Sequence, residues 1–245
     1  MFNKTLAARF TKIILEAQNT DEEGLTALRK KIIKAVDTFG AKRFVTVTAQ
    51  VLKDNFRIEG CNDVRIPLKR IFNISLDELE NVLDKKKYKL PAGHPIDLLS
   101  RDHKDNIQKL KRLKINLNQS SDTILVQDIK DYFKEMDTHI KKEEDVFFPI
   151  LEEKGMDEHP DNLKEEHKSF REILKTAVAI IENESDSSKS KEKIKPLMNK
   201  FIPDICNHIF RETYIFYPAA LEFIREKKEW KAIESGFEKC ESPKG

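Results

Sequence analysis

The chain has 245 residues, of which 39% are hydrophobic and 36% are charged. Its 45 basic and 43 acidic residues nearly cancel, so charge gives no basis for nucleic acid or an anionic membrane as the main partner. No apolar run approaches the roughly 20 residues of a membrane span, and the low counts of 7 glycines and 9 prolines favour long helices over strands.

The cysteines and the N-terminal segment indicate the compartment. Cys61, Cys206 and Cys240 are odd in number and form no CxxC pair, so we expect neither a disulfide framework nor a thiolate zinc site. The N-terminal segment is amphipathic, with charges spread through it, and lacks the apolar core and cleavage site of a secretory signal. We therefore expect a cytoplasmic protein.

Helical periodicity dominates residues 1–90, which we predict to form a helical N-terminal domain of unknown role. Apolar residues recur at three- and four-residue spacing over 2–18 and 21–39. The segment 42–56 is rich in β-branched residues that suit a strand, but its length and its neighbours favour a helix.

A shorter helix and a linker are predicted next. Residues 57–73 are expected to be irregular or short-helical. Ser75 and Glu78 have the spacing of a capping box, which predicts a helix start. The run KKKYKLPAGHP at 85–95 contains three helix breakers, so we predict a linker and a domain boundary there.

Four long helices are predicted after the linker, at 95–117, 122–154, 158–184 and 191–227. The polar connection ESDSSKSK is short, and short connections make neighbouring helices antiparallel. We therefore predict an all-α protein in which residues 91–228 form an up-down-up-down four-helix bundle. Residues 229–245 are expected to be a charged, frayed tail.

The second and fourth bundle helices carry the same phrase. One is HIKKEEDVFFP, from His139 to Pro149, and the other is HIFRETYIFYP, from His208 to Pro218. Each histidine shares a helix face with the glutamate four residues later, and each proline is expected to end or kink its helix. The first and third helices each supply one further histidine. The residues predicted to converge are His103, His139, Glu143, His167, His208 and Glu212.

All six side chains interrupt apolar stripes that face the predicted core. Unpaired buried carboxylates and imidazoles are strongly unfavourable, so a pair of metal ions is the expected compensating partner. Nitrogen and oxygen donors without thiolate suit iron or manganese better than structural zinc. Two glutamates can bridge two ions and two histidines can cap each, which leaves open coordination positions. The alternative is a plain bundle with scattered surface histidines.

These residues resemble the haemerythrin-like (HHE cation-binding) family over about residues 94–225. The resemblance implies two non-haem iron ions with an oxo or hydroxo bridge, with zinc or manganese as alternatives. Oxygen-carrying haemerythrins have a fifth histidine on the third helix, whereas here Leu163 and Arg171 flank His167 at four-residue spacing. The pattern is closer to the prokaryotic branch that includes iron-centre repair proteins. Those usually carry a cysteine pair in the N-terminal domain, where this chain has only Cys61.

The resemblance implies three alternative functions. A binding or sensing protein would hold O2 or NO at an open position, while the N-terminal domain contacts a redox or protein partner. An enzyme would act on NO, peroxide or ferrous iron, or would donate iron for iron–sulfur cluster repair under oxidative or nitrosative stress. In the third alternative the metal only stabilises the bundle.

Other residues near the six have simpler interpretations. Glu144 and Glu166 point about 100° away from the neighbouring ligands and are expected to be surface charges, unless local winding makes either an alternative ligand. His94 is expected to cap the first bundle helix or to reach the site. Tyr132 is expected to pack in the core or to hydrogen-bond near the centre, and Cys206 to be an inert buried thiol.

Overall fold

The computed structural model of the protein describes residues 3–54, 58–61, 63–85, 88–119, 122–156, 158–184 and 186–241. Within these residues the chain is all-α, as predicted, apart from turns and an isolated bridge between Ile58 and Cys61. None of the helices in this described part has the length and apolar character of a membrane-spanning segment.

Contacts within the chain define two compact units. One comprises Met1–Ile74 and Ile209–Arg225, and the other comprises Ser75–His208 and Glu226–Gly245. The predicted domain boundary after residue 90 concerns independent folding and stays a prediction.

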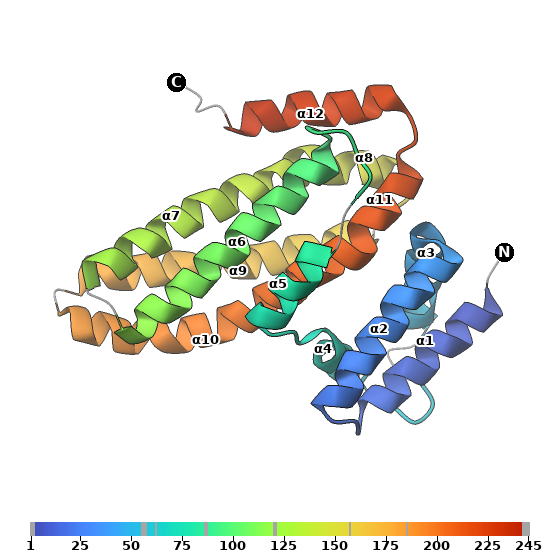
Figure 1. Ribbon diagram of the computed structural model, residues 1–245, viewed down its shortest axis with the longest axis horizontal. Coiled ribbons are helices and arrows are strands. Elements are labelled where there is room, and N and C mark those ends of the chain that lie inside the picture. The colour runs from blue at the N-terminus through green and yellow to red at the C-terminus, as the bar shows by residue number, and fades with distance from the viewer. Residues whose placement is uncertain are drawn as a thin grey trace. The chain divides into compact units, whose positions relative to one another are not determined.

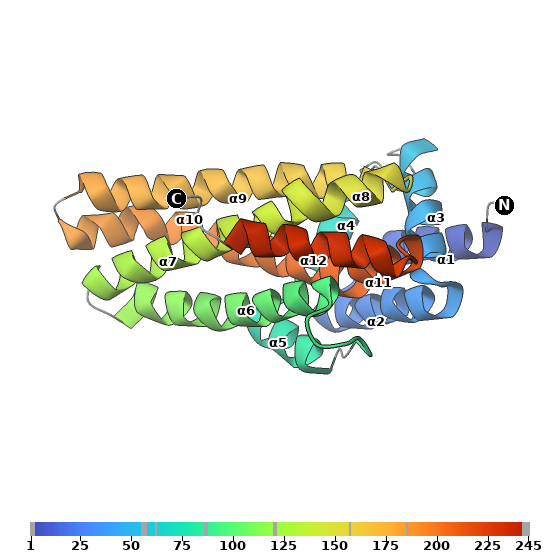
Figure 2. The same ribbon diagram turned by 90° about the horizontal axis from the view of Figure 1, so that it is seen from above.

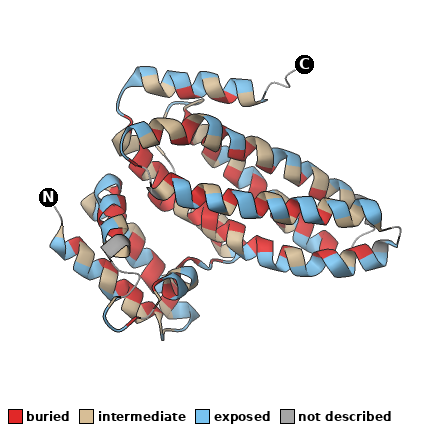
Figure 3. Ribbon diagram, turned by 180° about the vertical axis from the view of Figure 1, so that it is seen from behind, coloured by how far each residue is buried: buried red, intermediate tan, exposed pale blue. Residues whose placement is uncertain are grey.

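Four long helices form the core of the second unit and lie side by side (Figures 1 and 2). Their bounds are α6 Pro95–Gln119, α7 Asp122–Lys141, α9 Glu158–Asn183 and α10 Ser187–Arg211. The first and third agree closely with the prediction, whereas α7 and α10 end more than ten residues before the predicted ends at 154 and 227. The buried positions lie on the sides that face one another (Figure 3), and they include Leu99, Ile107, Leu110, Ile129, Leu174 and Phe201.

Two of these helices continue past their histidine–glutamate pair through a widened π-helical turn. The turns and the helices that follow them are η1 Lys142–Phe147 with α8 Phe148–Glu153, and η2 Glu212–Phe216 with α11 Tyr217–Phe223. In η1 the Phe148 amide donates to the carbonyl of Glu143, and in η2 the Tyr217 amide donates to that of Glu212. Each of these bonds spans five residues, which is the π-helical spacing.

The prolines explain the widened turns. Pro149 and Pro218 come directly after the two donating residues. A proline has no N–H, and in an α-helix its ring crowds the carbonyl four residues back, which a wider turn relieves. The helices therefore continue where an end or a kink was expected.

The C-terminal segment differs from the expected frayed tail, because residues Lys227–Glu241 form helix α12. Ile233 and Phe237 on this helix are buried, and α12 packs on α6, α7 and η1. Together with Trp230 they form an apolar stripe at helical spacing, which the many charges of the segment obscure in the sequence. Residues 242–245 lie outside the described part of the chain.

Helix α5, Leu76–Lys85, begins as the capping pattern predicts. The Ser75 hydroxyl accepts the amide of Glu78 at 3.1 Å. Glu80 on α5 then pairs with Lys111 and accepts from the amide of Gln108 at 2.6 Å, both on α6. These contacts hold α5 against the first bundle helix.

The first unit contains α1 Lys4–Ala17, α2 Glu22–Phe39, α3 Ala41–Asp54 and α4 Arg65–Phe72, together with η2 and α11. The segment 42–56 is helical as far as Asp54, in agreement with the favoured prediction, and 55–57 lie outside the described residues. Glu222 on α11 accepts the first amide of α3, from Ala41, at 2.6 Å. Gly40 makes the tight turn before it at a φ of 83°, which a residue with a side chain rarely adopts.

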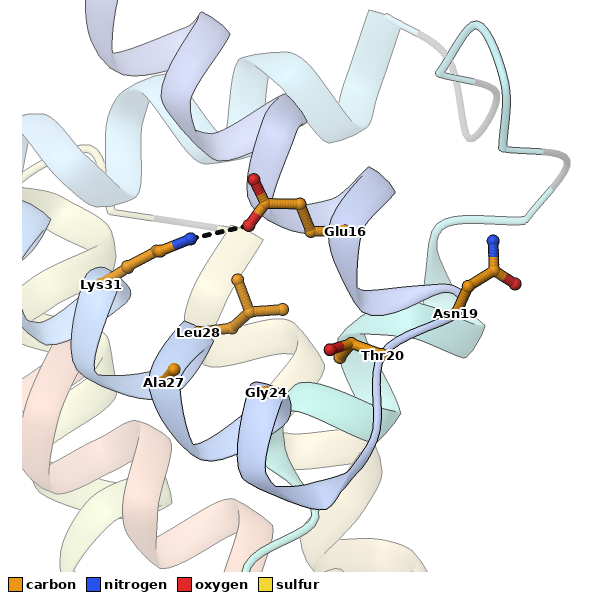
Figure 4. Close-up of a pocket in the computed structure, with 7 residues that line it drawn as sticks. All are labelled: Glu16, Asn19, Thr20, Gly24, Ala27, Leu28 and Lys31. Carbon is orange, nitrogen blue, oxygen red and sulfur yellow. Dashed lines mark hydrogen bonds and ion pairs between the residues drawn. The ribbon is translucent and has the colours of Figure 1, made fainter.

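An open groove of about 420 Å³ lies between α1 and α2 (Figure 4). Glu16 and Lys31 form an ion pair of 2.7 Å across it. The groove lining offers one carboxylate, and that carboxylate is already paired, so the groove has no cluster of metal-ligating groups.

The docking of α12 gives a first prediction. Phe237→Ala removes a buried aromatic ring and should lower the free energy of unfolding by about 3 kcal/mol, as measured by urea titration. Lys239→Ala, at an exposed position of the same helix, should change it by less than about 0.5 kcal/mol. Equal, negligible effects of both substitutions would contradict the packing of α12.

Candidate metal centre

The six predicted residues all lie in the interior of the protein. His103 belongs to α6, His139 to the end of α7 and His167 to α9, and none of these three is more than 4% exposed. The remaining three, with exposures of 0–2%, are Glu143, His208 and Glu212. Six groups with strong hydrogen-bonding demands therefore share a dry environment.

The six side chains converge inside the bundle. The Nε2 atoms of His167 and His208 lie 3.1 Å apart. One carboxylate oxygen of Glu143 lies between two helices, 3.4 Å from the Nε2 of His167 and 3.7 Å from that of His139. The rings of His103 and His139 are 5.0 Å apart between centroids.

These side chains form two groups whose ligand atoms lie within 4.8 Å of one another. One group is Glu143, His167, His208 and Glu212, and the other is His103, His139 and Glu212. Glu212 follows His208 by four residues on the continuous helix of α10 and η2, so the helix itself places it beside His208. Glu212 is the member that the two groups share.

In three of the four histidines, a carboxylate lies beside Nδ1, the ring nitrogen that faces away from the cluster. Asp102 lies 3.3 Å from the Nδ1 of His139. The other two pairs are Glu144 with the Nδ1 of His167, at 3.0 Å, and Glu166 with the Nδ1 of His208, at 2.7 Å. Each contact orients a ring so that Nε2 points inward, which is the usual arrangement of a metal-bound histidine.

Glu144 and Glu166 are partly exposed, at 20% and 36%, but they are more than the surface charges that were expected, because each contacts a histidine. Each is adjacent in sequence to one candidate ligand but contacts the histidine of a neighbouring helix. A direction of about 100° from the ligand face places each side chain at the edge of the interface with the next helix, where it is only partly exposed. The sequence shows only that each glutamate is next to a candidate ligand. The packing of the helices determines which histidine it contacts.

Cations surround two of these carboxylates. Burial alone would raise the pKa of the Asp102 carboxyl, but His139 and Lys142 lower it to about 2. Burial likewise opposes ionisation of Glu144, and His167 and Arg171 outweigh it and lower the pKa of Glu144. Both carboxylates are thus held ionised and can accept a hydrogen bond from a protonated ring nitrogen.

Arg171 lies four residues after His167 on α9. Its guanidinium donates to Glu144 at 2.7 Å and to Asp137 at 2.9 Å. Arg171 therefore pairs with Glu144, the carboxylate that contacts the Nδ1 of His167.

Aromatic rings surround the histidines within the bundle. Phe148 stacks on His167 with centroids 5.9 Å apart, and Phe170 meets His208 edge-on at 5.2 Å. The Tyr132 ring packs edge-on against Phe201, with ring centroids 5.8 Å apart. This lining limits the access of water to the ring nitrogens.

The remaining uncertain residues have structural roles. His94 caps α6, since its Nδ1 accepts the amide of Ile96 at 3.2 Å. Tyr132 is a fully buried core residue, and its hydroxyl has no hydrogen-bond partner within the described residues. Cys206 is an inert buried thiol, as predicted, because burial raises its pKa to about 12.

The arrangement fits metal ions. An ion that binds nitrogen at about 2.1 Å holds neighbouring ligand atoms roughly 3.0–3.4 Å apart. The separation of 3.1 Å between His167 and His208, and of 3.4 Å between His167 and Glu143, fall in this range. With Nδ1 engaged by carboxylates, Nε2 is the nitrogen available to an ion.

The contact behind His208 gives a second prediction. Glu166→Ala should weaken metal binding about 10–100-fold, because the ring of His208 loses the partner that orients it. The affinity would be measured by competition between the protein and a chromophoric chelator for Zn²⁺. Glu165→Ala, at the exposed neighbouring position, is the matched control and should bind as the unmodified protein does. Equal affinities of the two variants would contradict the role of Glu166.

Comparison with known proteins agrees with this geometry. No curated protein matches the chain. The model of the hemerythrin HHE cation-binding domain matches residues 91–220, more than half of the chain and the part that contains all six residues. The chain therefore belongs to the hemerythrin HHE cation-binding domain family.

Proposed function

We propose that the protein binds two iron ions through His103, His139, Glu143, His167, His208 and Glu212, and that it binds or senses O2 or NO there. The observation that carries the proposal is the convergence of six buried nitrogen and oxygen donors in two groups that share a glutamate. When bound, a pair of ferrous ions would supply the open coordination positions and the electrons that binding of O2 or NO requires.

The geometry supports a division of the ligands between two ions. His103 and His139 form one pair, and His167 and His208 form the other. The Glu143 carboxylate reaches toward one histidine of each pair, and Glu212 belongs to both groups. Glu143 and Glu212 are therefore the residues that would be shared between two bound ions.

The donor set supports iron over a thiolate-held metal. All candidate donors are imidazole nitrogens or carboxylate oxygens. Cys206, two residues before His208, is buried, and its raised pKa keeps it protonated. A protonated thiol is a poor ligand for these ions.

The surroundings favour binding over turnover. Phe148 and Phe170 cover the histidines on two sides. Burial raises the pKa of Tyr132 well above its ordinary value, so this phenol retains its proton. An apolar, weakly acidic lining slows the protonation and release of a reduced ligand, which suits a protein that holds its ligand reversibly.

The first unit supplies a means of reporting the state of the site. Glu212 lies in η2, and η2 packs against α2 and α3. The rings of Phe210 and Phe72, on α4, have centroids 6.0 Å apart. The Nζ of Lys42, on α3, lies 4.0 Å from the ring centroid of Phe223. We propose that the N-terminal helices carry changes at Glu212 to a redox or protein partner.

Iron analysis and optical spectroscopy test the proposal. Protein loaded anaerobically with ferrous iron should hold two iron ions per chain and should gain an absorption band with O2 or NO that disappears when the gas is removed. Irreversible bleaching with consumption of NO or peroxide would favour an enzyme. Two zinc ions with no response to either gas would favour a structural metal.

Removal of the metal gives a further prediction. An ion that binds only the folded protein adds about 2.7 kcal/mol of stability at a free concentration of 100 times its dissociation constant. For a chain of this size the melting temperature should rise by about 5–10 °C on loading, and chelation should reverse the rise. The double variant His139→Ala, His208→Ala should show no such rise. An equal rise in this variant would exclude the proposed ligands.

A further inference from the structure

Helix α12 lies directly over the π-helical turn that carries Glu143. Trp230 packs against His94 with ring centroids 4.4 Å apart and against Phe147, in η1, at 6.2 Å. Ile233 and Phe237 continue this apolar face and are buried. Helix α12 lies beyond residues 91–220, which the family model matches, and it packs on a turn that carries a candidate ligand.

The approach of α12 to η1 depends on a glycine. A Cβ atom placed on Gly236 would lie 2.4 Å from a methyl carbon of Val146 and 3.1 Å from the other. Valine is β-branched and stiff, so it cannot turn aside without a backbone shift. Any larger residue at position 236 would therefore lift α12 from the turn.

A chain of charged contacts leads from α12 to a candidate ligand. The Lys142 ammonium is 2.6 Å from Glu241 on α12 and 3.0 Å from Asp102 on α6. Asp102 in turn lies 3.3 Å from the Nδ1 of His139. Lys142 is only 4% exposed, whereas the Glu241 side chain is 57% exposed, so solvent screens the pair with Glu241 more than the pair with Asp102.

Arg171 is the corresponding cation on the His167 side of the site, and both of its carboxylate partners lie on bundle helices or on the turn η1. Arg171 supports Glu144 behind His167, and its second partner is Asp137. Arg171 lies in α9 and Asp137 in α7. The two sides of the centre thus differ in the origin of their outer contacts, because on the His139 side one contact comes from α12.

We propose that α12 is a clamp that positions His139 through Glu241, Lys142 and Asp102, so that its docking controls the retention of the metal ion on the His103–His139 side. When α12 lifts, Glu241 moves away with it, and the Lys142 ammonium becomes exposed and can turn from Asp102 toward Glu241 or water. Asp102 then no longer holds the ring of His139 in place. The inference rests on the proposed metal binding but not on O2 or NO as the ligand.

Release of Co²⁺ into excess EDTA tests the clamp, with the protein loaded with Co²⁺ alone and its absorption followed with time. In Gly236→Val about half of the bound Co²⁺ should leave roughly tenfold faster than from the unmodified protein, while the other half leaves at the unmodified rate. Ser235→Val, the same substitution at the exposed preceding position, should leave both rates unchanged. A merely structural defect would accelerate both halves together.

A second variant tests the same contact without the risk that Gly236→Val fails to fold. Glu241→Gln removes only the charge of a mostly exposed side chain and should accelerate the same half about threefold. Unchanged release from both variants, or equal acceleration of both ions, would overturn the clamp and leave the proposed function standing. Failure of the unmodified protein to hold Co²⁺ would overturn the metal centre itself, and the clamp with it.

Discussion

The dehydration of six ionisable side chains in the middle of a helical bundle is the constraint on which the rest of this structure depends. An imidazole or a carboxylate transferred from water to a protein interior loses several kcal/mol of hydration unless other groups replace the water. Outer carboxylates lie beside His139, His167 and His208, and aromatic rings pack on the last two. Metal ions bound at the centre would replace hydration there too. The site is therefore a layered arrangement and not six isolated ligands.

The layers alternate in charge from the centre outward. The inner nitrogens are backed by the carboxylates of Asp102, Glu144 and Glu166, and two of these are backed by the cations Lys142 and Arg171. Alternation lets each buried charge find an opposite neighbour, which is the condition under which buried charges are tolerated. The two halves share the inner layers and differ in the outermost one, where α12 contributes only on one side.

The repeated phrase also repeats a backbone shape. In both copies the amide before the proline donates to the carbonyl of the glutamate five residues back, so proline and glutamate are coupled through one widened turn. Such π-helical turns occur frequently at functional sites. The second copy lies in the segment that packs on the N-terminal helices α2 and α3.

The sequence alone determined the helical class, the four bundle helices, the cap at Ser75 and the six residues that converge, because helical periodicity and i, i+4 spacing are local properties of the chain. Tertiary structure decided the partners of Glu144, Glu166 and Arg171 and the docking of α12, since each depends on which neighbouring helix lies opposite. Contacts between helices join residues far apart in the chain, and no local pattern encodes the distance between them. The direction of a side chain can thus be predicted from its place on a helix, whereas what it meets there cannot.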